Sequence, residues 1–261
     1  MNKTLMPMIF VGHGSPMSAI EDDEFSRTWR ALSHKLPRPK AIVAISAHWY
    51  AEKTMVSSLL KNSMIYDMYG FPKELYEVVY EAPGDPALAK RIVSLLGPEA
   101  SLAPRGLDHG SWAPLKWIFP EADIPVLSLS LNGYLSPAEH FALGKKLQAL
   151  REEGVLLFAS GDVVHNLGLL DWDKTDGFPF ADEFDQAVKD AILKKDYGAV
   201  VHYEKFGAIA KKSVPTPEHF LPLLYLLGAA YPSDRVTVFN DRRIYGSLSM
   251  TGYLFENEAT V

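Results

Sequence analysis

Two histidines follow predicted strands near the start of the chain. Ile9–Val11 runs into Gly12-His13-Gly14-Ser15-Pro16, and Ala41–Ala47 runs into His48 and Trp49. A short apolar run closed by glycine is typical of a buried strand that ends in a turn. Open α/β sheets build their sites at such strand ends, and neutral imidazole is a common ligand of zinc and redox metals. These two histidines therefore predict part of a metal site.

Three further histidines have similar settings. His109 lies in the glycine-bounded segment Gly106–Trp112, His165 follows the apolar run Val155–Ala159, and His219 precedes a long apolar run. In a doubly wound sheet such positions converge on one crevice. The remaining histidines lack this setting and are predicted to be surface or packing residues: His34, His140 and His202.

The number of ligands follows from what a working metal site needs. A metal that binds substrate keeps positions open, so three protein ligands are expected. His13 and His48 are the firmest candidates, and His219 is the natural third. Glu218 competes with His219, because two histidines and one carboxylate are usual for non-haem iron, and a helix N-terminus favours an anion.

His109 and His165 are then candidates for proton transfer and for steering a bound oxygen. Imidazole titrates nearest neutral pH, so it accepts and returns a proton without a large pKa adjustment. Asp108 and Asp162 are candidates either to orient an imidazole or to form turns. Four aromatic residues are candidates to line a pocket for a planar substrate or to lie in the core: Trp49, Tyr69, Phe71 and Trp112.

The elements that must position these residues alternate along the chain. The pattern predicts helices over Glu21–Lys35, Pro86–Leu96, Ala113–Phe119, Ser136–Glu153, Phe184–Leu193 and Phe220–Ala230. Strands are predicted at Ile9–Val11, Ala41–Ala47, Thr54–Leu60, Ile124–Leu131, Val155–Ala159, Val236–Phe239 and Ser247–Phe255. Ser136 and Thr216 are predicted N-caps. Strand, helix and strand in this order indicate a parallel βαβ unit, and no linker or repeat divides the chain.

Composition narrows the function classes. The 261 residues include no cysteine, so a metal must be bound by His, Asp or Glu. A net charge of -6 and the lack of a basic cluster argue against nucleic-acid binding. The apolar runs are too short to span a membrane. A cytoplasmic location fits the absence of cysteine, and a chain without cysteine also fits any other compartment.

Six blocks in order carry a family resemblance that spans nearly the whole chain. They resemble the 4,5-DOPA extradiol dioxygenases, a branch of the class III extradiol ring-cleaving dioxygenases. The blocks are Gly12-His13-Gly14-Ser15-Pro16, Ser46-Ala47-His48-Trp49, Asp108-His109-Gly110-Ser111-Trp112, Ser160-Gly161-Asp162-Val163-Val164-His165-Asn166, Pro215-Thr216-Pro217-Glu218-His219 and Tyr245-Gly246-Ser247-Leu248-Ser249-Met250.

The resemblance implies a single catalytic α/β domain over residues 1–261, with a central, mostly parallel sheet flanked by helices. It implies one divalent metal ion, Zn(II) or Fe(II), bound by His13, His48 and His219. His165 is then the catalytic acid and base, or also a fourth ligand, and His109 lies near the oxygen site. The implied substrates are a catechol such as L-DOPA and dioxygen, without nucleic acid or membrane, in a monomer or small homo-oligomer.

Two other functions use the same residues. A zinc hydrolase would use the three histidines to form a hydroxide near neutral pH, with His165 as the base. A non-enzymatic metal-binding or catechol-binding protein needs no proton-transfer groups, so five histidines in one crevice argue against it. Ring cleavage is the preferred prediction, because it rests on the ordered blocks.

Overall fold

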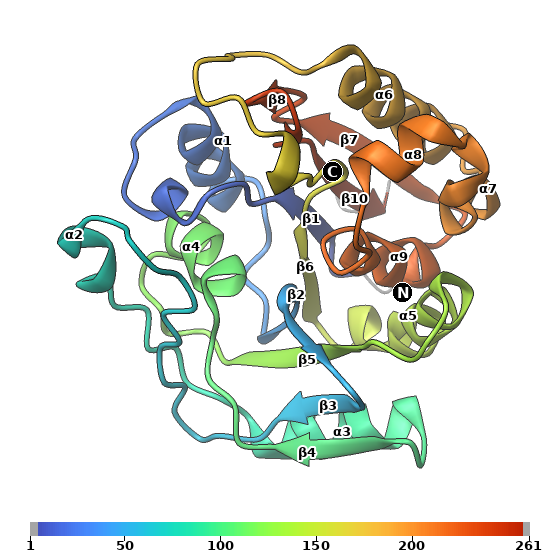
Figure 1. Cartoon of the computed structure of the whole chain (residues 1–261). Helices are drawn as coiled ribbons and strands as arrows, with labels where there is room; N and C mark the ends of the chain where they lie inside the picture. The colour runs from blue at the N-terminus through green and yellow to red at the C-terminus, as the bar shows by residue number, and fades with distance from the viewer. Residues whose placement is uncertain (1–4, 258–261) are drawn as a thin grey trace.

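A twisted sheet of eight strands forms the centre of the molecule (Figure 1). The computed structural model describes residues 5–257, so the outermost four residues at each end of the predicted domain lie outside the description. The strand order is β4-β3-β5-β2-β6-β1-β10-β7. The strands are β1 (Met8–Gly12), β2 (Ala41–Ala51), β3 (Thr54–Ser57), β4 (Ala100–Ala103), β5 (Val126–Asn132), β6 (Val155–Gly161), β7 (Asp234–Phe239) and β10 (Gly252–Asn257).

The middle of this sheet is parallel. Strand β6 pairs in parallel with both β1 and β2, and β2 pairs in parallel with β5. Antiparallel pairs join β3 to β5, β10 to β1 and β7 to β10. The short strands β8 (Arg243–Ile244) and β9 (Leu248–Ser249) form a separate antiparallel pair. The predicted α/β fold with a mostly parallel sheet is confirmed.

Helices cover both faces of the sheet. Figure 1 shows α1 and α4 on one side and α5 and α9 on the other. No helix in residues 5–257 has an apolar stretch of the length needed to cross a membrane. The α-helices are α1 (Glu24–Ser33), α2 (Lys73–Tyr76), α3 (Pro86–Leu96), α4 (His109–Ile118), α5 (Pro137–Glu152), α6 (Pro179–Leu193), α7 (Tyr197–Val201), α8 (Ala208–Ser213) and α9 (Leu221–Ala229). Short 3-10 helices are η1 (Pro16–Ala19), η2 (Leu167–Leu169) and η3 (Tyr203–Phe206).

A hydrophobic core lies on each face of the sheet. Trp29 of α1 and Trp112 of α4 pack on one face, whereas Leu147 of α5 and Leu224 of α9 pack on the other. Every residue of β6 is buried. Strands covered on both faces read as continuous apolar runs, which is why the central strands were recognisable in the sequence.

Helix ends agree with the sequence in one case and differ in another. Ser136 caps α5 as predicted, and Glu139 completes a capping box with it. The predicted N-cap at Thr216 is wrong, because α9 begins only at Leu221 and has no side-chain cap. The Thr216 hydroxyl instead donates a hydrogen bond to Glu218.

Several predicted strands have different limits, and the strand predicted at Thr54–Leu60 ends at Ser57. Strand β2 continues past Ala47 to Ala51, so His48 lies inside a strand instead of beyond its end, at a shift in the register with β5. The strand predicted at Ser247–Phe255 is divided into β9 and β10. At this division, the hydroxyls of Ser249, which ends β9, and of Thr251 donate to the buried carboxylate of Asp185, which ties this segment to α6.

Candidate metal centre and active site

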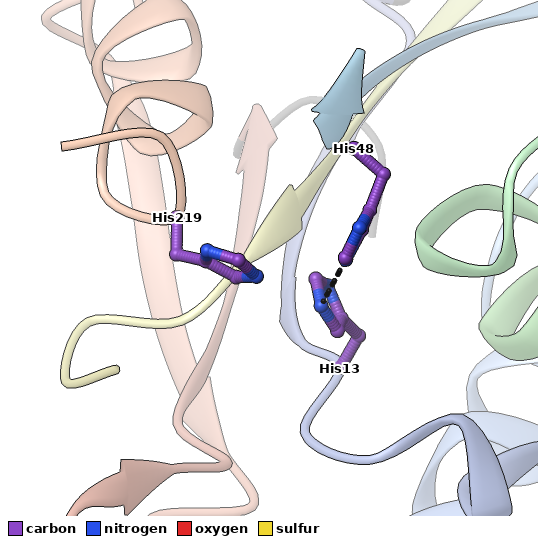
Figure 2. A group of neighbouring side chains, drawn as sticks. All are labelled: His13, His48 and His219. Carbon is purple, nitrogen blue, oxygen red and sulfur yellow. Dashed lines mark hydrogen bonds between the residues drawn. The ribbon is translucent and has the colours of Figure 1, made fainter. Parts of the chain in front are cut away.

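Three histidine rings from distant parts of the chain point toward one another (Figure 2). His13 follows β1, His48 lies in β2, and His219 precedes α9. One ring nitrogen of each lies within 4.8 Å of the others. The Nε2 atoms of His13 and His48 are only 3.1 Å apart. The parallel strands β1 and β2 flank β6, so their carboxyl ends deliver both rings to the same edge of the sheet.

The other two predicted site histidines adjoin this cluster. The ring of His165 stacks on that of His219, with centroids 3.4 Å apart and planes 4° apart. The centroid of His109 lies 3.9 Å from that of His48. His109 is the first residue of α4, so the loop predicted around it is wrong and the helix predicted from Ala113 begins earlier. All five histidines share one site, whereas His34 and His202 are exposed and His140 is buried elsewhere.

Hydrogen bonds determine which nitrogen of His13 faces the cluster. Its Nδ1 lies 2.9 Å from the Ser160 hydroxyl, which itself donates to the Gly110 carbonyl at 2.5 Å. A hydroxyl has one proton to donate, so His13 Nδ1 must be the donor to Ser160. In the neutral ring, Nε2 then carries a lone pair directed at the cluster.

Carboxylates orient the other two rings in the same way. His48 Nδ1 lies 3.2 Å from an Asp67 oxygen, and His219 Nδ1 lies 3.2 Å from a Glu218 oxygen. Ionised carboxylates only accept hydrogen bonds, so both Nδ1 atoms donate, and in the neutral rings both Nε2 atoms keep lone pairs. A second group holds the far nitrogen of most metal-binding histidines in this manner. The donor set therefore fits a divalent metal ion, with Glu218 at the outer nitrogen of His219.

The protonation of the cluster also suits a ligand role. Burial, followed by repulsion from the neighbouring histidines, holds the pKa values of His13 and His219 well below the usual range. Burial lowers the pKa of His48 as well, but the hydrogen bond to Asp67 and the negative charges of Asp108, Asp67 and Asp162 together outweigh burial and raise it. Burial lowers the pKa of His165 to about 4, so this ring is neutral near pH 7 and can accept a proton.

Asp67 is a site residue that sequence reasoning missed. Its Oδ1 lies 3.0 Å from His109 Nδ1 and accepts the His109 backbone N–H, while its Oδ2 faces His48. Burial raises the pKa of this carboxyl, but contacts with His109 and His48 outweigh it, so the group stays ionised. Asp67 lies in an irregular segment between β3 and α2, where no periodic pattern marks it.

The two other acidic candidates have different roles. Asp108 is the N-cap of α4 and accepts hydrogen bonds from the backbone and hydroxyl of Ser111. Asp162 is fully buried, and its Oδ1 accepts the Gly14 backbone N–H at 3.0 Å. Its Oδ2 lies 3.8 Å from His13 Nε2. Burial raises the pKa of Asp162 to about 7.

The cluster opens into a cavity of about 290 Å³ with mostly apolar walls. Of the predicted pocket aromatics, only Phe71 lines it. Trp49 and Trp112 are buried in the packing, and Tyr69 is 91% exposed. Trp172, which the sequence did not single out, lines the cavity instead. Its walls comprise the five histidines and Gly14, Ser15, Pro16, Asp67, Met68, Phe71, Leu167, Leu170, Trp172 and Leu248.

Comparisons with known proteins find relatives that cover nearly the whole chain. The chain is 43% identical to a protein of Escherichia coli (strain K12) named 4,5-DOPA dioxygenase extradiol, over 96% of this chain and 94% of that protein. A protein of the same name from Beta vulgaris is 38% identical over 94% of this chain and 95% of its own. The crystal structure of an uncharacterized E. coli K12 protein superposes with a TM-score of 0.83 at 40% identity, covering 95% and 99% of the two chains.

A family model matches nearly all of the described chain. It is that of the catalytic LigB subunit of aromatic ring-opening dioxygenase, and it spans residues 7–256. Neither this family nor the named relatives favour the zinc hydrolase. The chain belongs to the LigB family of aromatic ring-opening dioxygenases, and its activity is that of a ring-cleaving dioxygenase.

Proposed function

We propose that this dioxygenase opens the ring of a catechol such as L-DOPA at one Fe(II) ion held by His13, His48 and His219. The observation that carries the proposal is the convergence of three Nε2 lone pairs, each fixed by a partner at Nδ1. Relatives from E. coli and Beta vulgaris are named 4,5-DOPA dioxygenase extradiol. Fe(II) supplies the redox chemistry that couples catechol and dioxygen, whereas Zn(II) has none.

His165 and His109 divide the proton chemistry in this proposal. His165 is neutral and stacked on His219, so it accepts the proton that a catechol hydroxyl loses on binding. His109 is held at Nδ1 by Asp67, which leaves its Nε2 for the reacting oxygen. When His109 is protonated, its Nε2–H is a fixed donor at that point and stabilises developing negative charge. Asp67 holds His48 and His109 together, so the metal ligand and the oxygen-side histidine keep one relative position.

The cavity walls fit an aromatic substrate. Phe71 and Trp172 line the space in front of the histidines together with Leu167, Leu170 and Leu248. Apolar walls of this kind pack against a planar ring. The hydroxyl groups of a catechol then face the strongly polar side of the cavity, which is the histidine cluster.

Oxygen uptake tests this function. The protein is loaded anaerobically with Fe(II), mixed with aerated L-DOPA or 4-methylcatechol, and compared with a Zn(II)-loaded sample. We expect oxygen consumption and a new yellow absorption with Fe(II), and neither with Zn(II). A lack of uptake with Fe(II) on every catechol, or equal turnover with Zn(II), would contradict the proposal.

Single substitutions test the roles of the histidines. His13→Ala is expected to lose both bound metal and turnover, because it removes a ligand. His165→Ala is expected to retain the metal and lose turnover at least about 100-fold, the usual contribution of a general base. Metal content by mass spectrometry and oxygen uptake give the two readings, with the exposed His34→Ala as the control. Equal metal loss in the His13 and His165 variants would show that the ligand assignment is wrong.

A further inference from the structure

Three carboxylates contact the converging histidines, and one of them differs in position. In residues 5–257, Asp67 and Glu218 contact the outer Nδ1 atoms of His48 and His219. Asp162 is the carboxylate that the structure brings within 4 Å of an inner nitrogen, with its Oδ2 3.8 Å from His13 Nε2. An oxygen of Asp162 also lies within 4.8 Å of ring nitrogens of His165 and His219. Asp162 therefore lies on the side of the rings where the lone pairs converge.

The bonding of Asp162 is incomplete. Oδ1 accepts the Gly14 backbone N–H at 3.0 Å, and the backbone N–H of Asp162 donates to the His219 carbonyl at 2.9 Å. These bonds fix the carboxyl group between the segments that carry His13 and His219. Oδ2 is buried and has no hydrogen-bond partner among the described residues. A buried carboxylate without a partner is costly unless a cation compensates it.

The charge of the donor set points the same way. Three neutral imidazoles leave the charge of a divalent cation uncompensated in a buried site, and the carboxylates of Asp67 and Glu218 lie behind the rings. We propose that Asp162 is the acidic member of the metal site, with Oδ2 facing the cation. Its negative charge raises the affinity for a divalent ion and links the His13 and His219 segments through that ion. This inference rests on the metal site in the proposed function, and it adds a residue to that site.

Zn(II) binding tests the role of Asp162 without any turnover. Asp162→Asn keeps an acceptor for Gly14, removes the negative charge and replaces the other oxygen by an NH2 group of similar size. We expect its dissociation constant for Zn(II), measured by calorimetry, to rise about 10- to 100-fold. The metal-free variant should melt at or above the wild-type temperature, because a buried unpaired charge is gone. The rise in melting temperature on adding Zn(II) should shrink.

Glu218→Gln is the matched control. It removes one carboxylate charge from the same site, but from the outer side of His219, so we expect a smaller loss of Zn(II) affinity than for Asp162→Asn. A wild-type Zn(II) affinity in Asp162→Asn, or an equal loss in both variants, would overturn the inference. The inference would also be overturned if metal-free Asp162→Asn melted at a lower temperature than the wild type while Zn(II) raised both melting temperatures equally. That result would indicate a structural role for Asp162.

A second variant and the Zn(II) binding of the wild-type protein complete the test. If Asp162→Asn does not fold, Asp162→Ser keeps a small polar acceptor at the position and is judged by the same readings. If the wild-type protein binds no divalent ion, the proposed function fails together with this inference. If the wild-type protein binds Zn(II) and Asp162→Asn binds it with the same affinity, this inference fails while the proposed metal site stands.

Discussion

Each converging histidine owes its orientation to an acceptor at Nδ1, and the acceptors differ. Ser160 accepts from His13, Asp67 from His48 and Glu218 from His219. The hydroxyl of Ser160 is oriented in turn by the Gly110 carbonyl. Because every Nδ1 is a donor, every Nε2 carries a lone pair when the rings are neutral. The orientation of the three rings thus depends on side chains that lie behind them, away from the point where the rings converge.

A histidine outside the site makes the metal-free fold sensitive to acid. His140 of α5 is fully buried and hydrogen-bonds Tyr225 of α9 at 3.1 Å. Burial lowers its pKa to about 4, below the 6.5 of an exposed histidine. The unfolded chain therefore binds a proton that the folded chain refuses between these values, so stability present above pH 6.5 is lost as the pH falls toward 4.

We expect His140→Gln to weaken this pH dependence. From pH 7 to pH 5, His140 accounts for about 2 kcal/mol of the loss in the free energy of unfolding. Urea unfolding of both metal-free proteins at the two pH values measures the difference, and titration of the site histidines is common to both. Identical losses in wild type and variant would show that His140 does not contribute.

At the scale of elements, α5 and α9 approach each other closely through two glycines. A Cβ atom on Gly144 would lie 2.1 Å from the Tyr225 carbonyl, and one on Gly228 would lie 2.1 Å from the Phe141 carbonyl. Neither contact is sterically possible. These glycines let α5 and α9 pack closely against each other on the same face of the sheet. His219 lies two residues before the start of α9. The glycine in the middle of α5 thus has a packing reason.

Gly144→Ala is expected to lower the free energy of unfolding by about 1–3 kcal/mol, because the helices must move apart. The matched control is Gly198→Ala in α7, where the new Cβ meets its nearest atom at an ordinary 3.6 Å. There we expect no loss and a gain of up to about 1 kcal/mol from helix propensity. Chemical denaturation measures both, and a stable Gly144→Ala protein would contradict the close packing.

At the scale of the whole molecule, one buried ion pair joins parts from both ends of the chain. Arg151 at the end of α5 makes two bonds to Asp234 at the start of β7, of 2.6 and 2.8 Å. It also donates to the carbonyls of Met6, ahead of β1, and Ala229, in α9. Both charged side chains are completely buried. The pair thus fastens β1, α5, α9 and β7 at the end of the sheet away from the histidines.

Breaking this pair is expected to be costly. Arg151→Met leaves Asp234 buried and unpaired, so the free energy of unfolding should fall by about 3–5 kcal/mol. Adding Asp234→Leu should recover part of that loss, because it removes the stranded charge. Arg91→Met, which breaks an exposed pair with Glu153, should cost no more than about 1 kcal/mol. A double variant less stable than Arg151→Met would contradict this account.

The sequence by itself determined the central strands and the residue types near their carboxyl ends. Apolar runs, glycines and prolines act locally, so His13, the parallel sheet around β6 and the N-cap at Ser136 were predictable. The ordered blocks around the five histidines also indicated the dioxygenase function. Where several local signals compete, as around His48 and His109, the element limits were wrong.

Only the tertiary structure decided how the site is held. Asp67 lies 42 residues from His109, and Ser160 lies 147 residues from His13. Asp162 and Gly14, which join the two ligand segments, are 148 residues apart. No local pattern records such pairs, because their contacts form when the sheet brings strand ends together. Residue types and turns are local properties of a chain, whereas tautomers, buried charges and cavity walls depend on neighbours that folding supplies.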